Sequence, residues 1–286
     1  MQPSAEDKPR WWIWPTILSL DAPAVAVLWQ LLLADAASVS LGAPETLVLG
    51  SSVWLAYSSD RWFEGWRVEP GRIRTHRHRF TQRLRWPLAF AWAAVLGLDL
   101  SLSLLGLSHR ELKAGFLLLG PVVAYLLFHQ LLHRGSRWRP PKELCVAVLL
   151  AGGAAVFIAA RPGAHLRAMA IPLAIFALLC LSNCALISVW EDEVDRSHGQ
   201  TSLALQFARG AAFSRILPWL LSALCAAAWI CAGEGSRAAA ACGAASGVLL
   251  GLVDLAERRI GRSLARVLAD VALATPAIPL ILRALR

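Results

Sequence analysis

Long apolar runs alternate with short polar segments along the whole chain. Nine runs are candidate membrane-spanning helices, at about residues 14–35, 43–58, 86–107, 113–132, 143–160, 168–189, 213–232, 237–255 and 267–283. A helix needs roughly 20 apolar residues to cross the hydrocarbon core of a bilayer. Because a bilayer offers backbone groups no water, continuous apolar runs of this length indicate helices. The pattern therefore predicts an all-α integral membrane protein, a single polytopic domain over residues 1–286.

Composition supports a membrane protein over a soluble one. Hydrophobic residues make up 57% of the chain and charged residues 16%, whereas a soluble domain usually carries about a quarter charged residues. Residues 1–13 are expected to form a cytoplasmic N-terminal tail before a first helix that is retained and not cleaved as a signal. The six cysteines fall in or beside apolar runs, and we interpret them as reduced packing residues.

The net charge is +9, and its distribution predicts how the chain crosses the membrane. With nine spans, 21 of the 28 Lys and Arg residues lie on one side, mostly in segments 59–85, 134–142, 190–215 and 256–266. Positively charged loops usually stay in the cytoplasm. We therefore expect a multi-pass protein of the cell membrane with a cytoplasmic N-terminus and an external C-terminus. The same rule accounts for the basic excess without nucleic acid as a partner.

Two acidic segments follow the second and sixth runs, within the predicted cytoplasmic loops 59–85 and 190–212. Each has two carboxylates at positions i and i+4, Asp60 with Glu64 and Glu191 with Asp195. On a helix this spacing places both on one face, where like charges repel. Mg²⁺ prefers oxygen ligands and would offset that repulsion. Two facing pairs would hold a diphosphate bridged by Mg²⁺, and the alternative is plain solvated loop charge.

Polar residues beside the acids complete this predicted diphosphate site. Arg61 follows Asp60 directly, and Lys142 begins the fifth run. Guanidinium groups and ammonium groups both suit phosphate oxygens, although a cation at a helix end also serves as an interfacial anchor. Tyr57 and Asn183, within the two segments, are the remaining candidates for contact with the diphosphate.

Other polar residues have weaker indications. His76 and His78 lie in a basic run that favours contact with lipid head groups or an anionic substrate over metal binding. Five carboxylates lie within or near the runs: Asp21, Asp35, Asp99, Asp254 and Asp270. Carboxylates inside a membrane are costly and are usually paired. Asp21 and Asp270 are the best candidates for buried partners.

The two acidic segments resemble those of the UbiA superfamily of intramembrane prenyltransferases. That family has two Asp-rich segments, in the loops after helices two and six, approximately Asn-x3-Asp-x3-Asp and Asp-x3-Asp. Asp60 and Glu64 match the acids of the first, and Glu191 and Asp195 match those of the second. Downstream residues and a lysine also resemble the family pattern: Gly199, Ser202 and Lys142. The resemblance implies nine transmembrane helices around a central cavity.

The chain departs from the family pattern and resembles a divergent branch. Ala56 stands where the first segment has Asn, and two of the four acids are Glu. The resemblance implies Mg²⁺-dependent transfer of an isoprenyl group from an isoprenyl diphosphate to an aromatic or other lipophilic acceptor in the membrane. It implies that the four acids bind the metal and are catalytic. Two alternatives stay open: a catalytically silent relative that binds a polyprenyl or lipid phosphate, and a small transporter that uses its intramembrane acids.

Overall fold

In the part of the chain that the computed structural model describes, the protein is a helical bundle. The described residues are 10–67, 80, 83–128, 141–192, 202–207, 209–231 and 233–285. The side chains of 63–67 and 234 are not described. The elements are η2 (Trp11–Ile13), α1 (Trp14–Ile17), α2 (Asp21–Ala36), α3 (Ala43–Arg67), α5 (Arg85–Gly106), α6 (His109–Leu127), α7 (Lys142–Ala160), α8 (Leu166–Trp190), α10 (Leu203–Gln206), α11 (Gly210–Cys231), α12 (Glu234–Ile260), α13 (Arg262–Ala272) and α14 (Ala277–Ala284). Within these ranges there is no strand, so the all-α prediction is confirmed.

Apolar helices long enough to cross a membrane account for much of the bundle. By length and composition five described helices qualify, namely α5, α7, α8, α11 and α12, and the number reaches seven when each of two bent helix pairs is taken as one span. The helices α3 and α6 contain 25 and 19 residues but are not among these candidates. A multi-pass membrane protein is therefore confirmed, while the count of nine spans stays a prediction.

The first predicted helix is broken, which the sequence did not indicate. Instead of one helix over 14–35, α1 and α2 meet at 75°, and Ser19 at the break has a positive φ of 60°. A break inside a membrane protein frees carbonyl groups that need donors from neighbouring elements. Helix α3 supplies them, because Trp54 donates to the Leu18 carbonyl at 2.9 Å and Arg61 donates to the Thr16 carbonyl.

The last predicted helix, expected over 267–283, is broken in the same way. Helices α13 and α14 meet at 47°, and Trp29 of α2 donates to the free Leu273 carbonyl at 2.9 Å. Trp29 is fully buried and stacks on Phe176 of α8, with ring centroids 4.9 Å apart. The buried Trp29 side chain therefore fills space in the core and donates a hydrogen bond to a carbonyl that the break leaves free.

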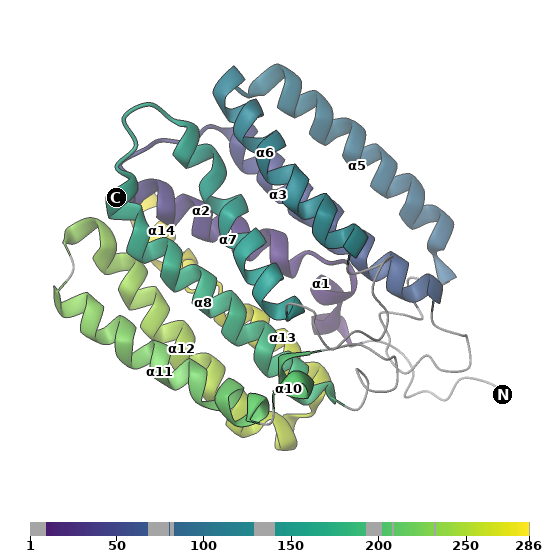
Figure 1. Cartoon of the computed structure of the whole chain (residues 1–286), viewed down its shortest axis with the longest axis vertical. Helices are drawn as coiled ribbons and strands as arrows, with labels where there is room; N and C mark the ends of the chain where they lie inside the picture. The colour runs from purple at the N-terminus through teal and green to yellow at the C-terminus, as the bar shows by residue number, and fades with distance from the viewer. Residues whose placement is uncertain are drawn as a thin grey trace.

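The core lies between α2, α7, α8 and α12, and α5 lies at the edge (Figure 1). Of the apolar stretch in α12, 56% is buried inside the protein, whereas in α5 it is 6%. Because a membrane solvates apolar side chains, the exposed face of α5 is consistent with contact with lipid. The C-terminal ends of α3 and α8 lie at the end of the bundle that carries α10, while α14 lies towards the other end (Figure 1).

Glycines on α12 allow α11 to approach closely. Gly243, Gly247 and Gly251 are spaced four residues apart on α12, a spacing that places small residues on one face and favours tight helix pairs in membranes. A Cβ atom on Gly247 would lie 2.7 Å from the Pro218 carbonyl oxygen and 3.0 Å from the Ser222 backbone nitrogen. Both neighbours are backbone atoms, so a side chain forces the two helices apart.

We expect Gly247→Ala to destabilise the protein by about 1–3 kcal/mol, the usual cost of overpacking. The measurement is thermal unfolding of the detergent-purified protein. Gly97→Ala on α5 is the matched control, because a Cβ atom there would meet nothing within 4 Å. Equal effects of the two substitutions would contradict a close α11–α12 contact.

An ion cluster joins three elements at the end of the bundle away from α10. Arg161, which follows α7, forms ion pairs with Glu45 of α3 and, at 2.8 Å, with Glu111 of α6. The two glutamates are 3% and 2% exposed. Glu111 also forms a capping box with Ser108 at the start of α6, so its carboxylate satisfies a helix terminus as well.

Candidate functional site

The first acidic segment is helical instead of forming a loop. We predicted that the second helix ends near residue 58, but α3 continues to Arg67. No proline occurs between Pro44 and Pro70, and Arg61 anchors the extension by its contacts with the first helix. Asp60 is half-buried on this extension. The backbone of Glu64 is helical as well, but its side chain lies outside the described part.

One face of α3 organises the residues beside Asp60. Tyr57 and Arg61 are one turn apart, and the Arg61 guanidinium lies 4.3 Å from the centre of the Tyr57 ring, a cation–π contact. Besides its bond to the Thr16 carbonyl, Arg61 donates to the Ser19 hydroxyl at 3.0 Å. The guanidinium is therefore held against the break between α1 and α2.

Asp21 at the start of α2 is the ionic partner of Arg61. Its carboxylate lies 3.8 Å from the Arg61 guanidinium, and both side chains are 7% exposed. The other oxygen of Asp21 accepts the Ala22 backbone N–H at 2.9 Å. A carboxylate in the first turn of a helix is also favoured by the helix dipole. The prediction that Asp21 has a buried partner is confirmed.

Helix α13 contributes two further charged residues, which together with Tyr57, Arg61 and Asp21 form a polar cluster. Arg266 and Asp270 are one turn apart on this helix. The Asn183 side-chain amide of α8 donates to Asp270 at 2.9 Å, which confirms a buried partner for Asp270 as well. Arg266 donates to Glu191, directly after α8, at 2.6 Å, and the two side chains are 14% and 22% exposed.

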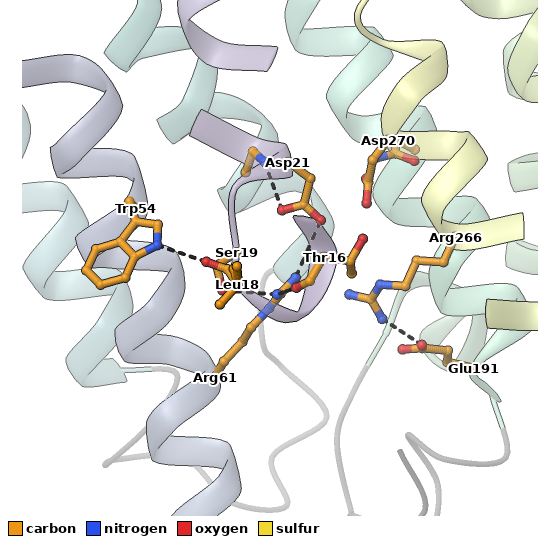
Figure 2. A network of polar contacts seen from close by, with 11 residues as sticks. Thr16, Leu18, Ser19, Asp21, Trp54, Arg61, Glu191, Arg266 and Asp270 are labelled. Carbon is orange, nitrogen blue, oxygen red and sulfur yellow. Dashed lines mark hydrogen bonds and ion pairs between the residues drawn. The ribbon is translucent and has the colours of Figure 1, made fainter. Parts of the chain in front are cut away.

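The two halves face each other. Figure 2 shows the guanidinium groups of Arg61 and Arg266 pointing toward one another, with Asp21 and Asp270 beside them. Tyr57 lies within electrostatic reach of both arginines and both aspartates. Five polar atoms of this cluster are buried with no hydrogen-bond partner among the described groups: Arg61 Nη2 and Asp21 Oδ2, which form the ion pair at 3.8 Å, and Asn183 Oδ1, Arg266 Nε and Asp270 Oδ2. Buried polar atoms without partners are costly, so this group suits a polar ligand or ordered water.

Lys142 lies near the same cluster, as the first residue of α7. Cys184 of α8 is within electrostatic reach of Lys142, Arg266 and Asp270. The neighbouring Glu143 is 1% exposed, and its carboxylate accepts the Leu203 backbone N–H at 3.1 Å. Glu143 thus caps α10 and fixes the chain that follows the second acidic segment beside Lys142.

The structure brings together four of the eight predicted site residues. Tyr57 and Arg61 on one side, and Asn183 and Glu191 on the other, meet through Arg266 and Asp270. Asp60 precedes Arg61 directly on α3, and Lys142 is the first residue of α7. Other predicted residues lie outside the described residues or side chains: Glu64, His76, His78, Asp195 and Gly199.

The described side chains include two of the four predicted metal ligands, Asp60 and Glu191. Within the described residues, no three or more His, Cys, Asp and Glu side chains form a set that could hold a metal ion. Two of the four predicted ligands fall outside that search. Of the two that are described, Asp60 has the oxygen chemistry that Mg²⁺ prefers, whereas Glu191 is engaged by a guanidinium. Asp60 also has a polar contact within the protein, so its fit to Mg²⁺ rests on its donor chemistry, whereas Glu191 already has a cation beside it.

The missing asparagine of the first segment is not replaced by its neighbours on α3. The Ser59 hydroxyl donates to the Leu55 carbonyl at 2.7 Å, within its own helix. The ring of Tyr57 stacks on Arg61. Asn183 of α8 is instead the described amide side chain in the cluster, and it bonds Asp270.

Sequence reasoning missed Arg266, which we had counted only as a basic loop residue. A signal was present: Arg266 and Asp270 have the one-turn spacing of an ion pair on a helix, and Asp270 is a membrane carboxylate that needs a partner. The predicted boundary of the last helix at residue 267 placed Arg266 in a loop. Helix α13 begins at Arg262, so Arg266 is inside it.

Comparisons with known proteins identify the fold. No protein-family model and no curated protein matches the sequence. A solved structure described as the apo structure of a UbiA homolog from Aeropyrum pernix K1 aligns over 97% of this chain and 100% of its own, with a TM-score of 0.58 and 20% identity. A structure of a digeranylgeranylglyceryl phosphate synthase aligns over 93% of this chain and 98% of its own, at 15% identity and a TM-score of 0.49, and the fold assignment does not depend on it. This chain therefore has a UbiA-like fold.

Proposed function

We propose that this protein transfers an isoprenyl group from an isoprenyl diphosphate to a lipophilic acceptor in the membrane, as a divergent member of the UbiA superfamily. The observation that carries the proposal is the pair of facing guanidinium groups, Arg61 and Arg266, in a buried cluster beside the ends of α3 and α8. Planar guanidinium forks bind phosphate oxygens in pairs. The UbiA-like fold supports the same function.

The residues beside the cluster would hold the diphosphate end of the substrate. Arg61 Nη2 forms the ion pair with Asp21 at 3.8 Å but makes no hydrogen bond with a described group, and Arg61's other contacts fix its position. Lys142 would add a point charge from the start of α7. Asp60 and, as the sequence predicts, Glu64 and Asp195 would hold Mg²⁺. When bound, this ion would stabilise the negative charge that builds on the leaving diphosphate.

The transfer exchanges one bond for another. The C–O bond of the isoprenyl diphosphate breaks, with its electron pair going to the diphosphate. A nucleophilic atom of the acceptor then bonds the allylic carbon and loses a proton. Water would quench the cationic carbon, so the surrounding apolar helices protect the reaction. We place this site at the cytoplasmic face, in accordance with the predicted distribution of basic residues.

The experiment measures transfer of labelled isoprenyl groups by the purified full chain. Isoprenyl diphosphates of several lengths are supplied with membrane lipid extract as acceptor, in Mg²⁺ or in EDTA, and released diphosphate and labelled lipid are quantified. We expect labelled product in Mg²⁺ and at least about tenfold less in EDTA, since the metal assists departure of the leaving group. Mass spectrometry of lipids retained during purification guides the choice of acceptor.

Three other results would contradict this proposal in distinct ways. Tight binding of the diphosphate without turnover on any acceptor would favour a silent relative that binds lipid phosphates. Ion-coupled uptake by proteoliposomes would favour a transporter. Absence of both diphosphate binding and turnover would remove the prenyltransferase hypothesis altogether.

A further inference from the structure

We propose that Glu191 is not a metal ligand but the positioning residue of Arg266, whose guanidinium supplies positive charge to the diphosphate from the α13 side. The inference rests on the proposed function for the identity of the substrate. It goes beyond that function because it assigns a second cationic residue and a different role for the first acid of the second segment.

The ion pair between these residues is direct and largely buried. Arg266 Nη1 lies 2.6 Å from Glu191 Oε1, and the side chains are 14% and 22% exposed. Charge-assisted bonds of this length are the strong ones among protein hydrogen bonds. Breaking such a pair inside a protein leaves an uncompensated charge. Glu191 therefore has a resident cation already.

A metal ion and this guanidinium compete for the same carboxylate. Mg²⁺ requires near-octahedral oxygen coordination and retains several waters, whereas a guanidinium beside the carboxylate repels the ion. The identity of residue 191 agrees with the Arg266 contact. Where the resembling family has Asp, this chain has Glu, and the additional methylene extends the carboxylate toward α13. The departure from the family pattern thus has a physical consequence in this fold.

The orientation of Arg266 suits an anion. Its Nε is buried without a hydrogen-bond partner among the described groups, and its guanidinium faces that of Arg61 (Figure 2). Asp21 pairs with Arg61, and Glu191 pairs with Arg266. Each guanidinium already has one carboxylate partner, and the unpartnered Nε of Arg266 leaves one donor for a further anion. A diphosphate, with oxygens at both ends, matches two forks on opposite sides.

The test measures binding of inorganic pyrophosphate to the purified full chain by titration calorimetry, in Mg²⁺ and in EDTA. The variants are Glu191→Gln and Arg266→Gln, with Asp35→Asn as control, because Asp35 pairs with Arg283 of α14 at the opposite end of α2 from Asp21. If Glu191 positions Arg266, Glu191→Gln should weaken binding by about 3–10-fold to the same extent in EDTA and in Mg²⁺, since the charge-assisted bond that holds the guanidinium is weakened whether or not the metal is present. Arg266→Gln should weaken binding in both buffers by about tenfold or more.

Each other outcome has a distinct meaning. If Glu191→Gln weakens binding tenfold in Mg²⁺ and leaves binding in EDTA unchanged, Glu191 is a metal ligand and the inference is wrong. If the wild type binds pyrophosphate in Mg²⁺ but not in EDTA, the metal-independent contribution of Arg266 is wrong while the proposed function stands. If the wild type binds in neither buffer, the proposed function fails. Thermal unfolding of each variant, with Arg266→Lys as the conservative replacement, separates loss of binding from loss of fold.

Discussion

Asp60→Asn should lower Mg²⁺-dependent prenyl transfer by about 10²-fold or more, the scale at which loss of one group that stabilises transition-state charge usually acts. Asp60 lies half-buried on the extension of α3, next to the Arg61 that contacts the first helix. The substitution keeps size and hydrogen-bonding capacity but removes the negative charge that a metal needs. The measurement is kcat and KM for the isoprenyl diphosphate over a range of Mg²⁺ concentrations.

Ser59→Ala is the matched control for Asp60→Asn. Its hydroxyl bonds only the Leu55 carbonyl among the contacts that are described, at 2.7 Å, so we expect transfer within about twofold of wild type, a change of under 0.5 kcal/mol. The expected rate effect of having Ala56 in place of the family's asparagine lies between the effects of Asp60→Asn and Ser59→Ala. Loss of one hydrogen bond by the missing asparagine costs about 0.5–1.5 kcal/mol, roughly tenfold in rate. A rate for Asp60→Asn equal to that of the control would contradict a metal-binding role.

Arg161→Ala should destabilise the protein by about 1–3 kcal/mol, less than the loss of one partner from a fully buried ion pair, because the Arg161 side chain is 37% exposed. The substitution leaves Glu45 and Glu111 facing each other at 3% and 2% exposure with their shared cation gone. At about 2–4 °C per kcal/mol, the midpoint of thermal unfolding in detergent should fall by roughly 5 °C. Because the cluster lies at the end of the bundle away from Arg61 and Arg266, pyrophosphate binding by the folded protein should be unchanged.

Two further variants separate a charge effect from a general loss. Arg167→Ala removes an exposed arginine close to Arg161 in the sequence, at the start of α8, and we expect a change within about 0.5 kcal/mol. Glu111→Gln in the Arg161→Ala background removes one of the two unpaired carboxylates and should recover part of the lost stability. If the double substitution is less stable than Arg161→Ala alone, the ion-pair explanation is wrong.

Some residues of the candidate site are neighbours on one helix, and others meet only through contacts between helices. The sequence indicates the first kind and not the second. Asp60, Arg61 and Tyr57 lie on one helix, so spacing along the sequence was enough to group them. The sequence also predicts Glu191 as a site residue, and in the fold its partner Arg266 comes from another helix, 75 positions away. No local pattern reports which of several basic residues in a distant segment will reach it.

The sequence by itself determined the class of protein, the approximate helices and the likeness to the UbiA superfamily. These follow from hydrophobicity and short-range spacing, which are local properties that add up along the chain. The tertiary structure decided where helices break and what each break provides. The first helix bends at Ser19 and the last after Leu273 because Trp54, Arg61 and Trp29 from other helices supply donors for the free carbonyls. It also decided that Arg266 binds Glu191, since the partner of a buried charge is fixed by which helices pack together and not by the residues beside it in the chain.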